Sequence, residues 1–259
     1  MSTTALFQAH GDRFVAAALT RGPWDAQAQH GGAPAALIMR ALEQLPRPDG
    51  LAFARVTYEL LRPVPVGELE LRAEVVRGGR RVQLLEASLL TAEGVEVVRA
   101  RALQVARAQS GGNHTEMAAP PPGPESARPS EMVPRFSPMF APDAIEIRFA
   151  DGRFGGGSST GWFRLQVPVV PGESPSPLQR LAAAADFGNG TSAPLSWDDF
   201  VFINPDLTIY IEREPVGEWI CLQATTRIAP EGVGLAESVV YDVRGRVGRA
   251  LQSLLVAPR

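Results

Sequence analysis

The chain has 259 residues, of which 45% are hydrophobic, enough for one large domain or for two of about 130 residues. Its formal net charge of −3 offers no electrostatic basis for binding nucleic acid or an anionic membrane surface. The single cysteine, Cys221, excludes an intramolecular disulfide and a cysteine metal cage, and it suits a reducing compartment. Because no stretch approaches the roughly 20 apolar residues that span a bilayer, and the first residues lack a signal-peptide pattern, we expect a cytoplasmic protein.

The first part of the chain predicts a helix followed by an antiparallel meander. Residues 13–20 are predicted to form a strand, and residues 24–29 a loop. From Gly31 to Leu45 apolar residues recur at helical spacing, and Pro46 then ends the helix. Segments rich in Val and Leu, separated by Pro and Gly, predict four strands at about 51–62, 68–77, 81–91 and 95–106.

The pattern changes after residue 106 and then resumes. Residues 107–140 hold seven prolines with Ser, Gly and Glu among them, so we expect an exposed linker between a unit at 1–106 and a unit at 141–259. In the second unit the sequence predicts strands at about 145–149 and 162–167, a helix at 177–187 and a loop through Trp197. Four further strands are predicted at about 205–213, 218–227, 233–243 and 246–256.

The two units repeat one another at an offset of about 150 residues. The run Arg62-Pro-Val-Pro-Val-Gly-Glu matches Arg213-Glu-Pro-Val-Gly-Glu, and Arg101-Ala-Leu-Gln matches Arg249-Ala-Leu-Gln. A repeat of this length indicates two copies of one domain. Since the edges of sheets invite pairing, we expect two α+β units whose meanders join into one continuous sheet.

Asp186 stands out in the second unit. The small apolar residues of Leu181–Ala185 lead into this acid, and Gly188 and Gly190 follow, where we expect the chain to turn. An acid at the edge of a core typically has a shifted pKa. An ordinary acid at a helix-to-loop junction would have the same local sequence, so both interpretations stand at this point.

Two familiar motifs occur without the context they need. Gly157–Gly161 matches G-x-S-x-G, but a strand rather than a helix is predicted after it, and all three histidines precede it. Asp186-Phe187-Gly188 matches the magnesium tripeptide of kinases, but the other kinase motifs are missing. Three scattered histidines and one cysteine offer no spacing for a transition metal, so we expect no metal and no organic cofactor. The remaining chemistry is a carboxylate that activates water.

These features together resemble a known family. A central helix and a wrapped meander in each half resemble a double hotdog, and the second half resembles the TesB-like (type II) acyl-CoA thioesterases. That family uses a helix Asp, a Thr or Ser on the following strand and a Gln near the C-terminus to bind the attacking water. Asp186 matches the first and Gln252 the last. Aligning back from Tyr210 puts Asn204 at the Thr position, with Thr208 as the alternative if the register differs.

The first half carries a second resemblance, to the H-G-G motif of single-hotdog thioesterases. In those enzymes a glycine N–H polarises the thioester carbonyl, and His30-Gly31-Gly32 matches the motif. The acid that such enzymes carry about three turns into this helix is absent from residues 33–40. We therefore expect one composite site, in which His30, Gly31 and Gly32 bind the substrate and the N–H of Gly31 or Gly32 faces Asp186. Taken alone, His30 also fits a residue that caps or packs against the helix.

The resemblance implies a thioesterase that hydrolyses acyl-CoA, with Asp186 as general base and Asn204 and Gln252 holding the water. It also implies a homo-oligomer, with no nucleic-acid or membrane partner. Asn in place of Thr favours an alternative, a hotdog protein that binds acyl-CoA without turning it over. A hydratase acting on enoyl-CoA would want an Asp/His pair close in sequence, and no histidine is near Asp186 in the chain.

Overall fold

The computed structural model describes residues 5–108, 115, 118–135 and 137–259. The first unit places one long helix before a four-stranded meander, as predicted. Its elements are β1 (Phe7–His10), β2 (Arg13–Ala16), the 3-10 turn η1 (Ala18–Thr20), α1 (Gly32–Gln44), β3 (Leu51–Leu60), β4 (Glu68–Arg77), β5 (Val82–Thr91) and β6 (Glu96–Ala106). The strand predicted at 13–20 ends at Ala16, because the chain turns into η1 from Ala18.

The second unit repeats this plan with additions. Its elements are β7 (Arg128–Pro129), the π-helical turn η2 (Phe140–Ala144), β8 (Ile145–Asp151), β9 (Ser159–Leu165), α2 (Pro177–Ala185), α3 (Gly188–Ser192), β10 (Phe200–Ile203), β11 (Asp206–Ile211), β12 (Trp219–Ile228), β13 (Val233–Asp242) and β14 (Gly245–Pro258). The expected turn at Gly188 and Gly190 is wrong, because both residues lie in α3. Gly188 is required there for space, since a Cβ would come within 2.8 Å of Ser238 Oγ.

The two meanders join into one continuous sheet, as predicted. The described residues form a 14-stranded sheet in which every strand pair is antiparallel. Strands β4-β5-β6-β3 are followed by β11-β14-β13-β12, so the second meander repeats the first in reversed order. At the junction Thr57 of β3 faces Thr208 of β11, with their Oγ1 atoms 3.1 Å apart.

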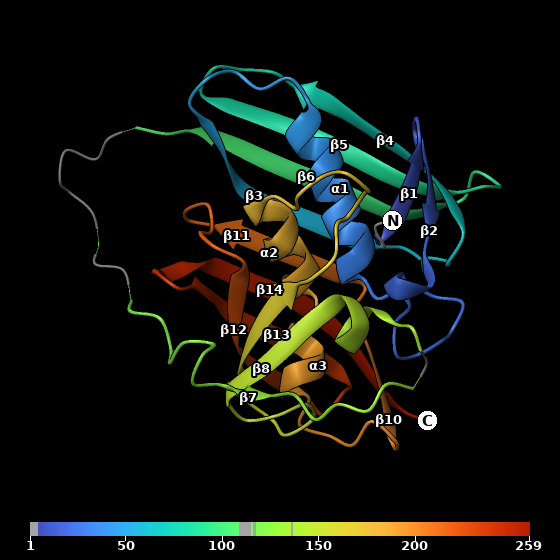
Figure 1. The fold of residues 1–259 in the computed structure, drawn as a ribbon, viewed down its shortest axis with the longest axis vertical. Coiled ribbons are helices and arrows are strands. Elements are labelled where there is room, and N and C mark those ends of the chain that lie inside the picture. The colour runs from blue at the N-terminus through green and yellow to red at the C-terminus, as the bar shows by residue number, and fades with distance from the viewer. Residues whose placement is uncertain (1–4, 109–114, 116–117, 136) are drawn as a thin grey trace.

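Helices α1 and α2 lie side by side, α1 against β4 and β5 of the first unit and α2 against β9 and β12 of the second (Figure 1). Their backbones touch at Gly32, where a Cβ would overlap the carbonyl oxygen of Ala183. At the other end of the pair, Glu43 of α1 accepts hydrogen bonds from Ser176 (2.7 Å) and Gln179 (3.0 Å) at the start of α2. The two units therefore meet through both ends of both helices. In the part of the chain that the structure describes, no helix is long and apolar enough to cross a membrane.

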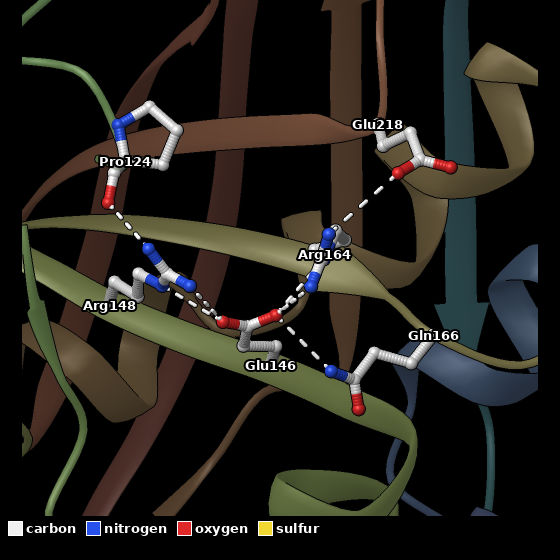
Figure 2. Close-up of polar contacts among 6 residues, drawn as sticks. All are labelled: Pro124, Glu146, Arg148, Arg164, Gln166 and Glu218. Atoms are coloured by element: carbon white, nitrogen blue, oxygen red, sulfur yellow. Dashed lines mark hydrogen bonds and ion pairs between the residues drawn. The ribbon is translucent and has the colours of Figure 1, made fainter.

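The proline-rich segment is in contact with the second unit over part of its length. Figure 2 shows Glu146 of β8 accepting hydrogen bonds from Arg148 and Arg164, while Arg148 also donates to the carbonyl of Pro124 at 3.0 Å. Phe140, at the end of the segment, is fully buried. The sequence suggested an exposed linker, and most of its described residues are exposed, but Ala127, Met139 and Phe140 are buried. Residues 109–114, 116–117 and 136 of this linker lie outside the described part.

An ion pair with a buried carboxylate ties the β11–β12 connection to the β13–β14 turn. Asp242 is completely buried and accepts hydrogen bonds from both ends of the Arg213 guanidinium, at 2.5 and 2.6 Å. The backbone N–H groups of Val216 and Arg244 also donate to it, each at 2.7 Å. Burial acts to raise the pKa of Asp242, but these hydrogen bonds outweigh it and the pKa is lowered.

We expect Asp242→Asn to lower the free energy of unfolding at neutral pH by about 3 kcal/mol, because it leaves the Arg213 charge without its partner. Because the folded pKa is lowered, the stabilisation is present above the unfolded pKa of about 3.9 and is lost as the pH falls through the folded pKa. Urea unfolding at stepped pH measures this, with the exposed Asp151→Asn as control. A difference between parent and Asp242→Asn that stayed constant into acid would contradict the expectation.

Candidate active site

A cavity of about 670 Å³ lies where the two units meet. Its walls come from the loop before α1, the β3–β4 connection, the proline-rich segment, the α2–α3 junction and the β10–β11 connection. The lining is largely apolar and includes Trp24, Val64, Met132, Phe187, Trp197 and Phe202. A concave, mostly apolar space with a few polar groups is typical of a small-molecule site.

Asp186 lies on this cavity, at the residue where α2 ends. Its side chain is 7% exposed. One carboxylate oxygen, Oδ1, accepts hydrogen bonds from Asn204 Nδ2 at 2.8 Å and from Gln252 Nε2 at 3.0 Å. The structure thus brings together the three residues that the resemblance singled out. Thr208, the alternative to Asn204, instead bonds to Thr57 in the sheet.

Gln252 holds the helical segment as well as the acid. It lies in β14 and is 1% exposed. While its Nε2 donates to Asp186, its Oε1 accepts a hydrogen bond from the backbone N–H of Asn189 in α3, at 2.9 Å. Both ends of this carboxamide therefore have protein partners. The first-half counterpart Gln104 is also buried, but it bonds to Gln83.

The other oxygen of Asp186 faces the first unit. Oδ2 lies 3.1 Å from Nδ1 of His30, and the same Nδ1 is 3.1 Å from the backbone N of Gly32. The imidazole ring stacks on Phe187, with ring centroids 4.3 Å apart, and lies beside Phe140 at 5.1 Å. The backbone N–H of Gly32 donates to Nδ1, so the one lone pair of this nitrogen in a neutral imidazole is already used. Nothing in the sequence pattern paired His30 with Asp186.

Burial dominates the protonation of this pair. It raises the pKa of Asp186, and the opposing effects of His30, Asn204, Gly32 and Gln252 do not outweigh it. Burial also lowers the pKa of His30, although the Asp186 carboxylate acts in the opposite direction. A carboxylate with a raised pKa is a better proton acceptor than an ordinary one, as a general base requires.

Gly31 approaches Asp186 so closely that no side chain fits. A Cβ on Gly31 would lie 2.7 Å from Asp186 Oδ2. Gly31 also lines the cavity, and within the described residues its N–H has no hydrogen-bond partner. A backbone donor beside a buried carboxylate can stabilise charge that develops on a carbonyl oxygen.

Several lining residues were not predicted. The proline-rich segment, which was expected to be exposed, contributes Met132 and Met139 to the cavity lining. It also contributes Phe140, whose ring lies beside the His30 imidazole. The apolar pair Met139-Phe140 was the available signal in the sequence. Asn189 also lines the cavity, from a helix that was not predicted. Among the residues described, no group of three or more His, Cys, Asp or Glu side chains is placed to hold a metal ion.

Comparison with protein-family models covers most of the chain. The model of the acyl-CoA thioesterase N-terminal domain matches residues 20–105, and the model of the acyl-CoA thioesterase C-terminal domain matches residues 115–256. The first range lies within the unit at 1–106, whereas the second covers most of the proline-rich segment as well as the unit at 141–259. No curated protein matches the chain.

Solved structures share the fold along nearly the whole length. A conserved protein with a hot dog fold from Alicyclobacillus acidocaldarius has a TM-score of 0.73 at 19% identity, covering 98% of this chain and 95% of that one. Acyl-CoA thioesterase II TesB2 from Mycobacterium marinum has a TM-score of 0.67 at 16% identity, covering 97% and 94%. The tesB protein of Mycobacterium avium subspecies paratuberculosis has a TM-score of 0.69 at 14% identity, covering 97% and 96%. The predicted α+β double hotdog is confirmed.

The contact between His30 and Asp186 can be tested in solution. Because the Asp186 carboxylate raises the pKa of His30 against the effect of burial, Asp186→Asn should lower this pKa further. An NMR titration of the His30 ring, assigned with a His30→Gln variant, measures the change. A His30 pKa that stays the same or rises in Asp186→Asn would show that the two side chains do not interact.

Proposed function

The chain belongs to the acyl-CoA thioesterase family, and on this basis we propose that it hydrolyses acyl-CoA thioesters by activating water with Asp186. The observation that supports this most is the buried Asp186 carboxylate, whose pKa is raised by burial. It lies next to Gly31, and both residues line the same largely apolar cavity. The carboxylate and the free N–H come from different units, as a composite site requires.

In the proposed reaction Asp186 takes a proton from water as the water oxygen attacks the thioester carbon. The carbonyl oxygen gains negative charge and accepts a hydrogen bond from the N–H of Gly31. The tetrahedral intermediate then collapses, the carbon–sulfur bond breaks, and the proton passes from Asp186 to the leaving sulfur. The products are a carboxylic acid and free CoA. His30 stays in contact with the acid during this cycle, with its Nδ1 3.1 Å from Oδ2 of Asp186.

Asn204 and Gln252 have a positioning role in this proposal. Both donate to Oδ1 of Asp186, which leaves the carboxylate one fixed orientation. The family Thr is replaced by Asn204, whose amide supplies the same kind of donor. In this proposal Asn204 and Gln252 do not bind the water themselves. They orient the Asp186 carboxylate, and the carboxylate binds the water.

One observation favours a second candidate function. The hydratase interpretation lacked a histidine near Asp186 in sequence, whereas in the fold His30 is in direct contact with the acid. An Asp/His pair can add water across the double bond of an enoyl-CoA, with one group accepting a proton and the other donating one. Hydration leaves the thioester intact, so release of free thiol distinguishes the two reactions.

We expect Asp186→Asn to reduce hydrolysis of hexanoyl-CoA by a factor of about 10² to 10⁴, the usual contribution of a general base. The steady-state rate of thiol release from hexanoyl-CoA measures this reduction. Asp151→Asn, at the exposed end of β8, is the matched control. A folded Asp186→Asn protein with the parental rate would contradict the mechanism. Binding of hexanoyl-CoA without any thiol release by the parent would favour the binding-only alternative. Loss of the double bond of hex-2-enoyl-CoA, assayed in parallel, would favour the hydratase.

The setting of the protein also stays a prediction. We propose acyl-CoA as the partner molecule, a cytoplasmic location and a homo-oligomeric assembly, following the sequence resemblance.

A further inference from the structure

One arginine on the cavity wall has no partner in the fold. Arg62, in the β3–β4 connection, lines the cavity and is exposed, whereas the side chain of Asp186 on the same cavity is 7% exposed. The cavity wall therefore extends from a buried carboxylate to an arginine at the surface. Among the described residues, the Arg62 side chain forms no ion pair and donates no hydrogen bond.

The repeat gives this arginine a counterpart with a different environment. Arg213 has the matching place in the second unit. The backbone N of Arg62 donates to the carbonyl of Val97 at 3.3 Å, and the backbone N of Arg213 donates to the carbonyl of Val247 at 3.4 Å. In the second unit, however, both oxygens of the buried Asp242 accept hydrogen bonds from the guanidinium.

The first unit has no acid at the position of Asp242. Asp242 is the last residue of β13, and the last residue of the matching strand β5 is Thr91. A glycine with positive φ follows each of them three residues later, Gly245 in one unit and Gly94 in the other. A threonine carries no charge, so it cannot replace the carboxylate. The arginine of the first unit has therefore kept its backbone position without an intramolecular partner.

The backbone that carries Arg62 is held in place on the cavity wall. The carbonyl of Val64 accepts a hydrogen bond from the N–H of Gln29 at 2.8 Å, and the N–H of Val66 donates to the carbonyl of Gln27 at 2.8 Å. These bonds fix the β3–β4 connection against the loop before α1, which forms another part of the same wall. Only the side chain of the arginine is free to turn toward a ligand.

Arg62 is also the cation on this wall whose charge no described residue neutralises. The exposed charged residues that line the cavity in the described part of the chain are Asp25, Arg62 and Arg135. The guanidinium of Arg135 lies 3.6 Å from the carboxylate of Asp198. A guanidinium presents several N–H donors in one plane, which matches the oxygens of a phosphate or a carboxylate.

From this arrangement we propose that Arg62 binds an anionic phosphate or carboxylate group of the thioester substrate. The proposal rests on the proposed function, because it concerns the substrate of the same site. Two parts of an acyl-CoA supply such a group. The pantetheine arm joins the thioester to the phosphates of CoA, and some acyl groups carry a second carboxylate. The chemistry is the same in both cases, and substrates that contain only one of the two groups distinguish the sources.

The test compares hexanoyl-CoA with hexanoyl-pantetheine, which has no phosphate, and with adipoyl-pantetheine, which has a carboxylate and no phosphate. Arg62→Gln removes the charge, and Arg62→Lys retains it. Arg77→Gln, at the exposed end of β4 and away from the cavity lining, is the matched control. Dissociation constants of three non-hydrolysable thioethers are measured in parallel, so the result stands even if no hydrolysis occurs. These are S-hexyl-CoA, S-hexyl-pantetheine and S-(5-carboxypentyl)-pantetheine.

If a phosphate is bound, Arg62→Gln lowers kcat/KM for hexanoyl-CoA and raises the Kd of S-hexyl-CoA, each about fivefold, and leaves the pantetheine ligands unchanged. If an acyl carboxylate is bound, the parent prefers the carboxylated pantetheine ligand to the hexyl one by about fivefold, and Arg62→Gln abolishes the preference. In both cases Arg62→Lys retains part of the effect. The effect also shrinks between about 0.05 and 0.5 M salt, because exposed charges are screened.

Parental values for every ligand in a folded Arg62→Gln protein would overturn the proposal. An equal loss for the neutral and the anionic ligands would also overturn it, because Arg62 would then act only through the shape of the wall. Circular dichroism checks folding, and Arg62→Ala decides the matter if Arg62→Gln does not fold. Failure of the proposed function is a different result, namely no thiol release by the parent, and the dissociation constants still decide whether Arg62 binds an anion.

Discussion

The backbone contact between α1 and α2 is the one on which the site depends. At Gly32 there is no room for a Cβ against the carbonyl oxygen of Ala183, so the start of one helix meets the end of the other directly. The residues just before Gly32 and just after Ala183 are thereby brought together across the two units. His30, Gly31 and Asp186 share one wall for this reason, although they lie in different copies of the repeat.

The repeat also explains why the two ends of the helix pair differ. Where the start of α1 meets the end of α2, a buried acid lines a cavity. At the opposite end, the start of α2 meets Glu43 of α1, and that carboxylate is held by Ser176 and Gln179. The end of the helix pair near Asp186 therefore borders the cavity. The pseudo-symmetric end near Glu43 is instead closed by hydrogen bonds between the two helices. The first unit contributes structure and a backbone donor, and the second contributes the acid.

Local pattern predicted much of the fold, and long-range contacts explain the remainder. Helical spacing from Gly31 and the Gly and Pro breaks located α1 and both meanders within a few residues. The family resemblance located Asp186, Asn204 and Gln252, which the fold brings into contact. The sequence analysis placed Gly31 or Gly32 opposite Asp186 but did not pair the imidazole of His30 with the acid. Helix α3 was missed because Gly188 and Gly190 usually break helices, whereas the close approach of β13 and β14 leaves no room for a side chain at Gly188.

The central claim is that turnover requires the close contact between the two units. Gly32→Ala should push the helix ends apart and reduce acyl-CoA hydrolysis by about a hundredfold, because small displacements of reacting groups have effects of that size. Gly78→Ala is the control, since its Cβ would meet only a Val75 methyl at 3.9 Å. The account predicts a folded Gly32→Ala protein that has lost most of its thiol release while Gly78→Ala keeps it. A folded Gly32→Ala protein with the parental rate would contradict a composite site.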